Sequence, residues 1–151
     1  MADKRRFELF AKFLADRFDA PRVFDVAGGM GKLNDALTAL GRTVTTFDLR
    51  HKRLNVRYAE RIFTLEEPCE AELVVGMHPD GATRIIVEYA VKHRIPFAIV
   101  PCCSDNGMPY KPWMRHLAEL GREAGFEVEE AELPMQGRAR VLVGRPPASH
   151  M

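Results

Sequence analysis

The stretch from Val23 to Leu37, VFDVAGGMGKLNDAL, decides the fold. A short apolar run passes Asp25 and breaks into a turn that contains Gly28, Gly29 and Gly31. The pattern of an amphipathic helix follows at once. A strand, a glycine turn and a helix in immediate succession are typical of the first unit of a doubly wound α/β sheet. In such sheets this turn lies where ligands bind, beyond the carboxyl ends of the strands.

Hydrophobic periodicity predicts the other elements outward from this stretch. Residues 3–18 carry apolar side chains at spacings of three and four, which predicts an amphipathic helix. Further helices are expected at 31–41, 81–94 and about 111–124, and strands at 22–29, 43–50, 61–65, 71–77, 96–103, 126–133 and 139–145. The strand at 61–65 has the weakest pattern. Strands that alternate with helices predict the α/β class, with a Rossmann-like, mostly parallel sheet of seven strands and helices on both faces.

The last two predicted strands depart from this alternation. Only PMQGR, residues 134–138, connects strand 126–133 to strand 139–145. A right-handed crossover between parallel strands needs a much longer connection. We therefore expect a hairpin, whose final strand runs antiparallel to the others.

Length and composition indicate one domain. The chain has 151 residues, of which 46% are hydrophobic and 28% charged, and residues 1–145 are predicted to form a single domain. Residues 146–151 are predicted to be a disordered tail, whose last residues could be a cloning remnant. The sequence has no apolar run of about 18 residues and starts with charged residues, so we expect a cytoplasmic protein without a membrane segment or signal peptide.

The cysteines and the charges exclude some function classes. Cys69, Cys102 and Cys103 are an odd number of cysteines without CxxC spacing, so we expect reduced thiols and no metal site. The net charge of +1 provides no global field for nucleic acid. The basic segment 50–61 is either a solvated loop or an edge that binds phosphate.

A second acidic residue narrows the choice of ligand. Asp48 closes the second predicted strand, 23 positions after Asp25, which is close to the spacing at which a carboxylate accepts hydrogen bonds from ribose hydroxyls. This favours NAD, FAD or S-adenosylmethionine. A dinucleotide prefers GxGxxG, whereas the pattern here is Asp25-x-Ala27-x-Gly29-x-Gly31. From the turn alone, a tight turn without any ligand remains the alternative.

This turn resembles the first motif of class I S-adenosylmethionine-dependent methyltransferases, usually DxGxGxG, with Ala27 in place of the first glycine. The order of elements from residue 3 to 145 resembles that superfamily as well. The resemblance implies that Asp25 and the backbone from Ala27 to Gly31 face the methionine part of S-adenosylmethionine. It also implies that Asp48 binds the ribose.

Three further residues are predicted on the cofactor side. Leu49 adjoins Asp48, and Met77 ends the predicted strand 71–77. The family pattern also places an acidic or polar residue near the adenine, and Glu66 is the candidate.

A narrower resemblance lies downstream, in GMHPDGATRIIVEYAV (76–91) and FAIVPCC (97–103). These segments are similar to a methyltransferase group that includes a tRNA 2′-O-methyltransferase. The matching positions are His78, Gly81, Cys102 and Cys103, and the departures are Asp80, where cysteine is frequent, and Ser104, where histidine is frequent. The zinc-binding segments of the tRNA enzyme have no counterpart in this sequence. The resemblance implies methylation of RNA.

Methyl transfer from a sulfonium needs an oriented acceptor and a group that takes the acceptor's proton. His78 and Asp80 follow the predicted strand 71–77, where such a group would lie, and both are predicted to be catalytic. With an ordinary pKa near 6.5, histidine is the better base near pH 7. The alternative is an ordinary Asp-Gly turn and a histidine that is merely hydrogen-bonded.

Candidates for substrate binding follow the predicted strand 96–103. Cys102 lines the acceptor pocket in this interpretation, although small buried hydrophobic residues are the more ordinary role for the cysteine pair. Tyr110 offers a ring that can stack on a base, and Lys111 and Arg115 offer charges for phosphate. The alternative is that the aromatic residues here, Trp113 in particular, pack on the sheet.

The sequence therefore predicts an S-adenosylmethionine-dependent methyltransferase that acts on RNA, at a tRNA ribose or base. One alternative is a non-catalytic, cofactor-binding subunit with a methyltransferase fold, whose protein partner supplies substrate recognition. The other is a methyltransferase for a protein or a small molecule.

Overall fold

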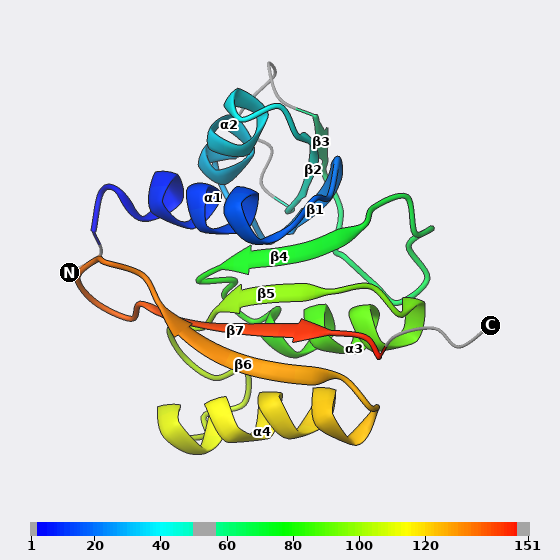
Figure 1. The fold of residues 1–151 in the computed structure, drawn as a ribbon, viewed down its shortest axis with the longest axis vertical. Helices are drawn as coiled ribbons and strands as arrows, with labels where there is room; N and C mark the ends of the chain where they lie inside the picture. The colour runs from blue at the N-terminus through cyan, green and yellow to red at the C-terminus, as the bar shows by residue number, and fades with distance from the viewer. Residues whose placement is uncertain (1–2, 50–56, 148–151) are drawn as a thin grey trace.

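The computed structural model describes residues 3–49 and 57–147, and in these ranges the chain forms a seven-stranded sheet with four helices (Figure 1). The helices are α1 (Arg6–Arg17), α2 (Lys32–Ala39), α3 (Thr83–His93) and α4 (Tyr110–Glu123). The strands are β1 (Arg22–Val26), β2 (Thr43–Phe47), β3 (Tyr58–Ala59), β4 (Leu73–Met77), β5 (Phe97–Val100), β6 (Glu127–Glu132) and β7 (Arg140–Arg145).

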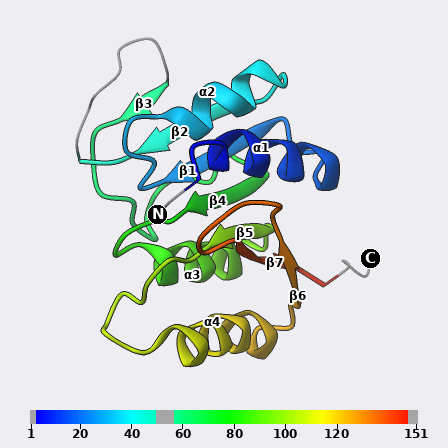
Figure 2. The ribbon, with the colours of Figure 1, turned by 90° about the vertical axis from the view of Figure 1, so that its left-hand side faces the viewer.

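The strand order is β3-β2-β1-β4-β5-β7-β6. Strands β1 to β5 pair in parallel, and β7 lies antiparallel between β5 and β6. The predicted fold class is therefore confirmed, including the final hairpin. In Figure 2 the carboxyl ends of the parallel strands face the viewer, with β1 and β4 near the middle of the sheet.

The core consists of one apolar layer on each face of the sheet. Alternate residues of a strand point to opposite faces, so Val23 of β1 and Val75 of β4 pack with α1 and α2. Their neighbours Phe24 and Val74 pack with α3 and α4. Strand β4 is buried along its whole length, as expected for a parallel strand covered on both faces.

Four strand predictions are corrected by the structure. Strands β1 and β2 end at Val26 and Phe47, three residues earlier than predicted. Strand β3 is Tyr58–Ala59 rather than 61–65. The N–H groups of Thr46 and Asp48 in and after β2 donate to the carbonyls of residues 57 and 59. Phe63 instead turns inward and packs on other aromatic rings. Strand β5 ends at Val100, since Pro101 has no N–H for the ladder.

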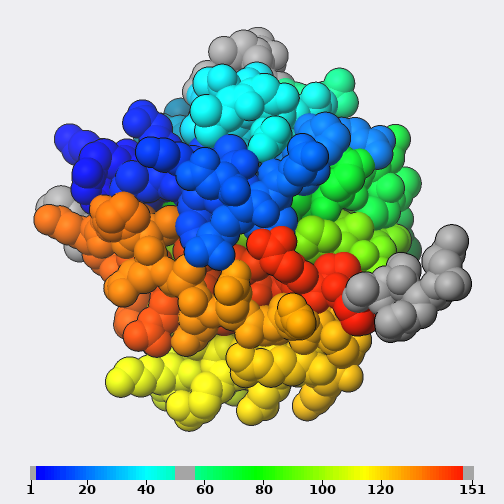
Figure 3. Space-filling model, viewed as in Figure 1, coloured from blue at the N-terminus to red at the C-terminus, as the bar shows by residue number. Residues whose placement is uncertain are grey.

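Parts of two other predictions lie outside the described residues. These are the basic segment over residues 50–56 and the tail over residues 148–151. Among the described residues, none of the helices combines the length and apolarity needed to cross a bilayer. Figure 3 shows the face on which α1 (blue) and α2 (cyan) lie over the sheet, beside the β6–β7 hairpin (orange to red).

Candidate functional site

A cleft of about 800 Å³ opens at the carboxyl ends of β1, β2 and β4. Five segments form its walls: the start of α1, the turn between β1 and α2, the end of β2, residues 61–63, and the loop from β4 into α3. Of the predicted site residues, Ala27, Gly28, Gly29, Asp48, Leu49, Met77, His78 and Asp80 line this cleft. The others, Asp25, Gly31, Glu66, Cys102, Tyr110, Lys111 and Arg115, do not belong to its lining.

The turn after β1 is fixed by its backbone. Ala27 has a φ of 56°, in the left-handed region that glycine adopts at little cost, and its N–H donates to the carbonyl of Phe47 at 2.7 Å. The alanine that replaces the first motif glycine therefore takes the glycine conformation, at a cost of about 1–2 kcal/mol. The geometry of the turn is kept.

Asp48 joins the glycine turn to the end of β2. Its Oδ2 accepts the N–H of Gly29 at 2.8 Å, and the hydroxyl of Tyr58 donates to the carbonyl of Gly29 at 2.7 Å. Both backbone groups of Gly29 are thereby held. Asp48 itself lies half-buried in the wall of the cleft. A carboxylate has about four acceptor positions, so it can also accept hydrogen bonds from a ligand.

Asp25 lies beneath the turn rather than on the cleft. Its side chain is buried, and the hydroxyl of Thr46 donates to its Oδ2 at 2.8 Å while accepting from Asn34 at 3.1 Å. Burial raises the pKa of Asp25 to about 7, against the opposing effect of the Thr46 hydrogen bond. This position differs from the implied contact with a cofactor. Asp25 supports the turn from below.

The buried carboxylate also explains Gly28. A Cβ on Gly28 would lie 2.2 Å from Oδ2 of Asp25 and 2.6 Å from Cγ2 of Thr46. The sequence suggests that this glycine lets a ligand approach the backbone. In the structure, Gly28 is required by the side chains packed under the turn.

His78 directly follows β4 on the cleft and has a φ of 47°. Its main-chain N–H donates to the carbonyl of Val100, and its Nε2 lies 2.9 Å from the carbonyl oxygen of Arg138. A carbonyl can only accept, so Nε2 carries the proton and Nδ1 keeps its lone pair in the neutral ring. Partial burial lowers the pKa of His78, opposed by the Arg138 hydrogen bond, and the charge of Arg6 lowers it further. The ring is therefore neutral at pH 7.

Asp80 lies exposed on the cleft near the cysteine pair. Oδ1 of Asp80 is 4.0 Å from Sγ of Cys103, which is 3.7 Å from Sγ of Cys102. Both cysteines follow the end of β5, where Cys102 is half-buried and Cys103 exposed. Their interpretation as buried residues of a central strand is wrong. Burial, with smaller effects of Cys103 and Asp80, raises the pKa of the Cys102 thiol to about 11.

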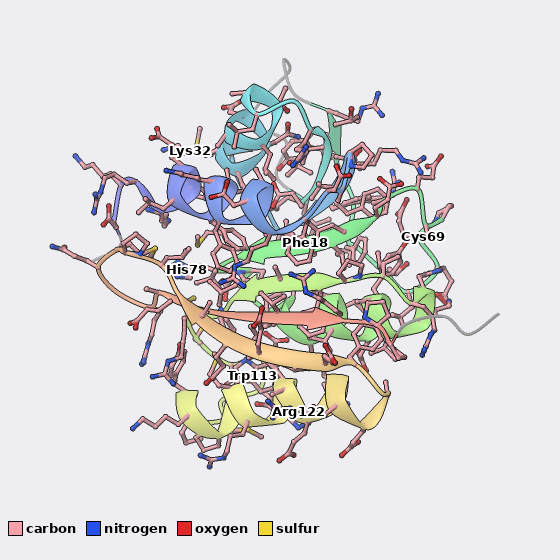
Figure 4. The ribbon with its side chains drawn as sticks, viewed as in Figure 1. Phe18, Lys32, Cys69, His78, Trp113 and Arg122 are labelled. Atoms are coloured by element: carbon pink, nitrogen blue, oxygen red, sulfur yellow. The ribbon has the colours of Figure 1, made fainter. Side chains whose placement is uncertain are left out.

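The predicted substrate residues of α4 do not line the cleft. Tyr110 is half-buried under the guanidinium of Arg138, whose Cζ is 3.7 Å from the ring centre, while Lys111 and Arg115 are exposed. Trp113 is 1% exposed and lies between α4 and the sheet (Figure 4). For Trp113, packing on the sheet is the correct interpretation.

Glu66 lies away from the cleft, exposed beside the end of α3. The adjacent backbone carbonyls, of Leu65 and Glu67, accept hydrogen bonds from Lys92 and Tyr89 of that helix. Figure 4 shows Cys69, three residues further on, on the opposite side of the molecule from His78. The cleft residues of this region are 61–63 instead.

Sequence reasoning missed several residues of the site. Arg6 and Phe7 reach the cleft from the first turn of α1, and Lys32 reaches it from the start of α2. Asp105, in the loop after β5, caps α3 by accepting the N–H groups of Arg84 at 2.9 Å and Thr83 at 3.4 Å. Among these residues, only Phe7 had a local signal in the sequence, namely its apolar position on the predicted helix 3–18.

Metal ligands do not gather in the part of the chain that the structure describes. There, no group of three or more His, Cys, Asp or Glu side chains is arranged to hold an ion.

The chain has the fold of S-adenosylmethionine-dependent methyltransferases. DesVI from Streptomyces venezuelae superposes with a TM-score of 0.70 at 15% identity, over 95% of this chain and 93% of that one. A 1,6-didemethyltoxoflavin-N1-methyltransferase from Burkholderia thailandensis was solved with 1,6-didemethyltoxoflavin and S-adenosylhomocysteine bound. It has a TM-score of 0.64 at 18% identity, over 97% of this chain and 80% of that one. A candidate RNA methyltransferase from Pyrococcus horikoshii has a TM-score of 0.59 at 16% identity over 91% and 77%.

The likeness to these proteins lies in the three-dimensional structure and not in the sequence. No family model matches the chain, and no curated protein matches its sequence. Against several larger O-methyltransferase structures, the chain spans about half of the other protein's length, between 51% and 56%.

Proposed function

We propose that this protein binds S-adenosylmethionine in the cleft and transfers the methyl group to an acceptor with a removable proton. The observation that carries the proposal is the hydrogen bond between Gly29 and Asp48 at the rim of the cleft. It brings the glycine turn after β1 and the carboxylate after β2 together, as a ligand with a ribose requires.

The residues present fit this cofactor. The Asp48 carboxylate suits a ribose with both hydroxyls free, and the exposed apolar side chains of Leu49 and Ile62 line the same cleft for a flat base. A volume of about 800 Å³ holds a ligand of this size together with an acceptor. When bound, S-adenosylmethionine supplies a methyl group activated by its sulfonium.

His78 supplies the proton chemistry in this proposal. Its neutral Nδ1 takes the proton of the acceptor while the acceptor forms its bond to the methyl carbon and the carbon–sulfur bond breaks. The lowered pKa lets the ring release that proton to water afterwards. Asp80 is exposed on the same wall and is the second candidate for this role.

RNA is the acceptor class that we propose. Arg138, whose carbonyl contacts His78, lies over Tyr110, and Lys111 and Arg115 present charges on the first turns of α4. Cations around a stacked aromatic ring suit a phosphate backbone and an unstacked base. The resemblance of residues 76–103 to a group with a tRNA 2′-O-methyltransferase supports the same class.

A small-molecule acceptor is the second candidate. Phe7, Met77 and Ile85 give the inner cleft an apolar lining, which suits a compact ring compound. The structural likeness to the 1,6-didemethyltoxoflavin methyltransferase favours it as well.

The test is methyl transfer from tritium-labelled S-adenosylmethionine to total tRNA, followed at low and high salt. We expect label in the tRNA, lost in the His78→Ala variant and reduced by salt because phosphate contacts release counterions. A matched control is His116→Ala, on α4 and outside the cleft. Cofactor binding without label in tRNA would overturn the RNA proposal and favour small acceptors. Absence of cofactor binding would overturn the methyltransferase proposal.

A further inference from the structure

The turn between β6 and β7, residues 134–138, contacts His78 in the cleft wall and Asp3, which precedes α1. Its Arg138 carbonyl bonds to the ring of His78, and the N–H of Gln136 donates to Oδ2 of Asp3 at 3.2 Å. Figure 3 shows this turn (orange) beside the start of the chain (dark blue). From the sequence this turn was predicted only as a short connection between two strands.

We propose that this turn positions the acceptor side of the cleft. It orients His78 by way of Arg138, and it orients Arg6 by way of Asp3. The cleft then takes an acceptor whose hydroxyl or amine lies beside an anionic group. The acceptor class rests on the proposed function. The positioning of His78 does not depend on it, and the two can be tested separately.

The first step is the ring orientation of His78. Because the Arg138 carbonyl accepts the proton on Nε2, the turn selects one tautomer and leaves Nδ1 as the basic atom. In the described residues, three non-glycine residues have positive φ: Ala27, His78 and Arg94. Arg94 ends α3, whereas Ala27 and His78 both line the cleft. A strained backbone at His78 needs such contacts to hold it.

The second step is the anchoring of Arg138 itself. Its guanidinium lies 3.7 Å from the ring centre of Tyr110, the first residue of α4. A cation–π contact of this kind stabilises the pair. It fixes the residue whose carbonyl faces His78. Tyr110 therefore acts on the cleft through Arg138, although it does not line the cleft.

The third step is the position of Arg6. The carbonyl of Asp3 accepts Nη1 of Arg6 at 3.0 Å, while the Asp3 carboxylate accepts the N–H of Gln136. Hydrogen bonds from Arg5, with a smaller one from Gln136, hold the pKa of Asp3 well below its ordinary range. The carboxylate is thus charged at neutral pH, and it ties the start of the chain to the turn.

Three charged residues border His78. Arg6 faces it from α1, Arg138 belongs to the turn, and Asp80 lies on the same loop as His78. Arg6 and His78 line the same cleft, Arg6 from α1 and His78, with Asp80, from the loop between β4 and α3. An acceptor that places its X–H group at Nδ1 of His78 can therefore direct a neighbouring phosphate or carboxylate toward Arg6 and away from Asp80.

The test of positioning is NMR of the histidine ring nitrogens in the whole protein without cofactor. The signals of His78 are those that are absent from the spectrum of His78→Gln. We expect wild-type His78 to carry its proton on Nε2. Arg138→Ala and Tyr110→Ala both keep the carbonyl of residue 138 but remove the cation–π contact that holds it in place, so each should shift the tautomer ratio toward Nδ1–H by up to about fivefold, the limit set by complete loss of the hydrogen bond to Nε2. Tyr110→Phe keeps the ring and should leave the ratio unchanged.

An unchanged ratio in both alanine variants would overturn the positioning role. If Tyr110→Ala unfolds, which a thermal melt shows, Arg138→Lys replaces it, because lysine keeps the charge and loses the planar stack.

The test of the acceptor class uses inorganic phosphate as the probe and the His78 ring signals as the readout. We expect phosphate to shift these signals in wild type and about tenfold more weakly in Arg6→Gln, with Arg17→Gln as the control at the far end of α1. Equal shifts in wild type and Arg6→Gln would overturn the anionic acceptor. If the NMR results hold and no methyl transfer is found, the proposed function fails while the positioning stands.

Discussion

The main-chain N–H of Gly29 donates a 2.8 Å hydrogen bond to Oδ2 of Asp48. The two residues follow neighbouring parallel strands, in which Val26 of β1 pairs with Phe47 of β2. Each therefore leaves the sheet at the same edge, and the bond closes one wall of the cleft.

Gly28→Ala is expected to destabilise the protein. The new Cβ would lie 2.2 Å from Oδ2 of the buried Asp25, and crowding of this kind costs about 1–3 kcal/mol. Urea denaturation measures the loss. Met30→Ala is the control, since Met30 lies in the same turn with its side chain 50% exposed. A Gly28→Ala variant as stable as wild type would show that Asp25 does not limit the turn.

Asp25→Asn is expected to change how stability depends on pH. The pKa of Asp25 rises from an ordinary 3.8 to about 7 in the folded protein, mainly through burial. Between these two pH values the folded state binds a proton that the unfolded state releases. The contribution of Asp25 to the free energy of unfolding is therefore complete below pH 3.8 and is lost as pH rises through 7.

One such group can lower the free energy of unfolding by at most about 1.4 kcal/mol for each pH unit by which the pH rises. Urea denaturation of wild type and Asp25→Asn at pH 5, 6 and 7 should show a shallower decline in the variant. Asp16→Asn, exposed on α1, should follow wild type. Parallel curves for wild type and Asp25→Asn would contradict a protonated Asp25.

Asp105→Ala is expected to loosen the start of α3. The carboxylate accepts two main-chain N–H groups there, and loss of such a cap costs about 0.5–2 kcal/mol. Hydrogen exchange of Thr83 and Arg84 should quicken, with a smaller change in Asp105→Asn, which keeps one acceptor oxygen. Unchanged exchange at both amides would contradict the cap.

The sequence predicted those features whose signals are local. The strand, turn and helix from Val23 onward lie within one short segment, and the position of Asp48 follows from the length of one strand–helix–strand unit. The hairpin followed from a connection too short for a crossover. These patterns were sufficient for the fold and for the meeting of the glycine turn with Asp48 at the cleft.

Contacts across long stretches of chain could not be predicted in this way. The carbonyl of Arg138 reaches His78 over 60 residues, and Asp105 reaches Arg84 over 21. Two-residue β3 is too short for a periodic signal, whereas RIFTL at 61–65 is apolar enough to resemble a strand although only Phe63 in it is fully buried. The cleft wall around His78 depends on long-range contacts of this kind.

The most direct test of the account is titration calorimetry of the protein with S-adenosylmethionine, S-adenosylhomocysteine and NAD, beside Asp48→Ala and Asp19→Ala variants. Asp19 is exposed and lies outside the cleft, so it controls for the loss of a carboxylate. We predict micromolar binding of the two methionine-derived ligands, kept in Asp19→Ala and weakened at least about tenfold in Asp48→Ala because the ribose loses a charged acceptor. NAD as the preferred ligand, or equal affinity in both variants, would contradict the central claim.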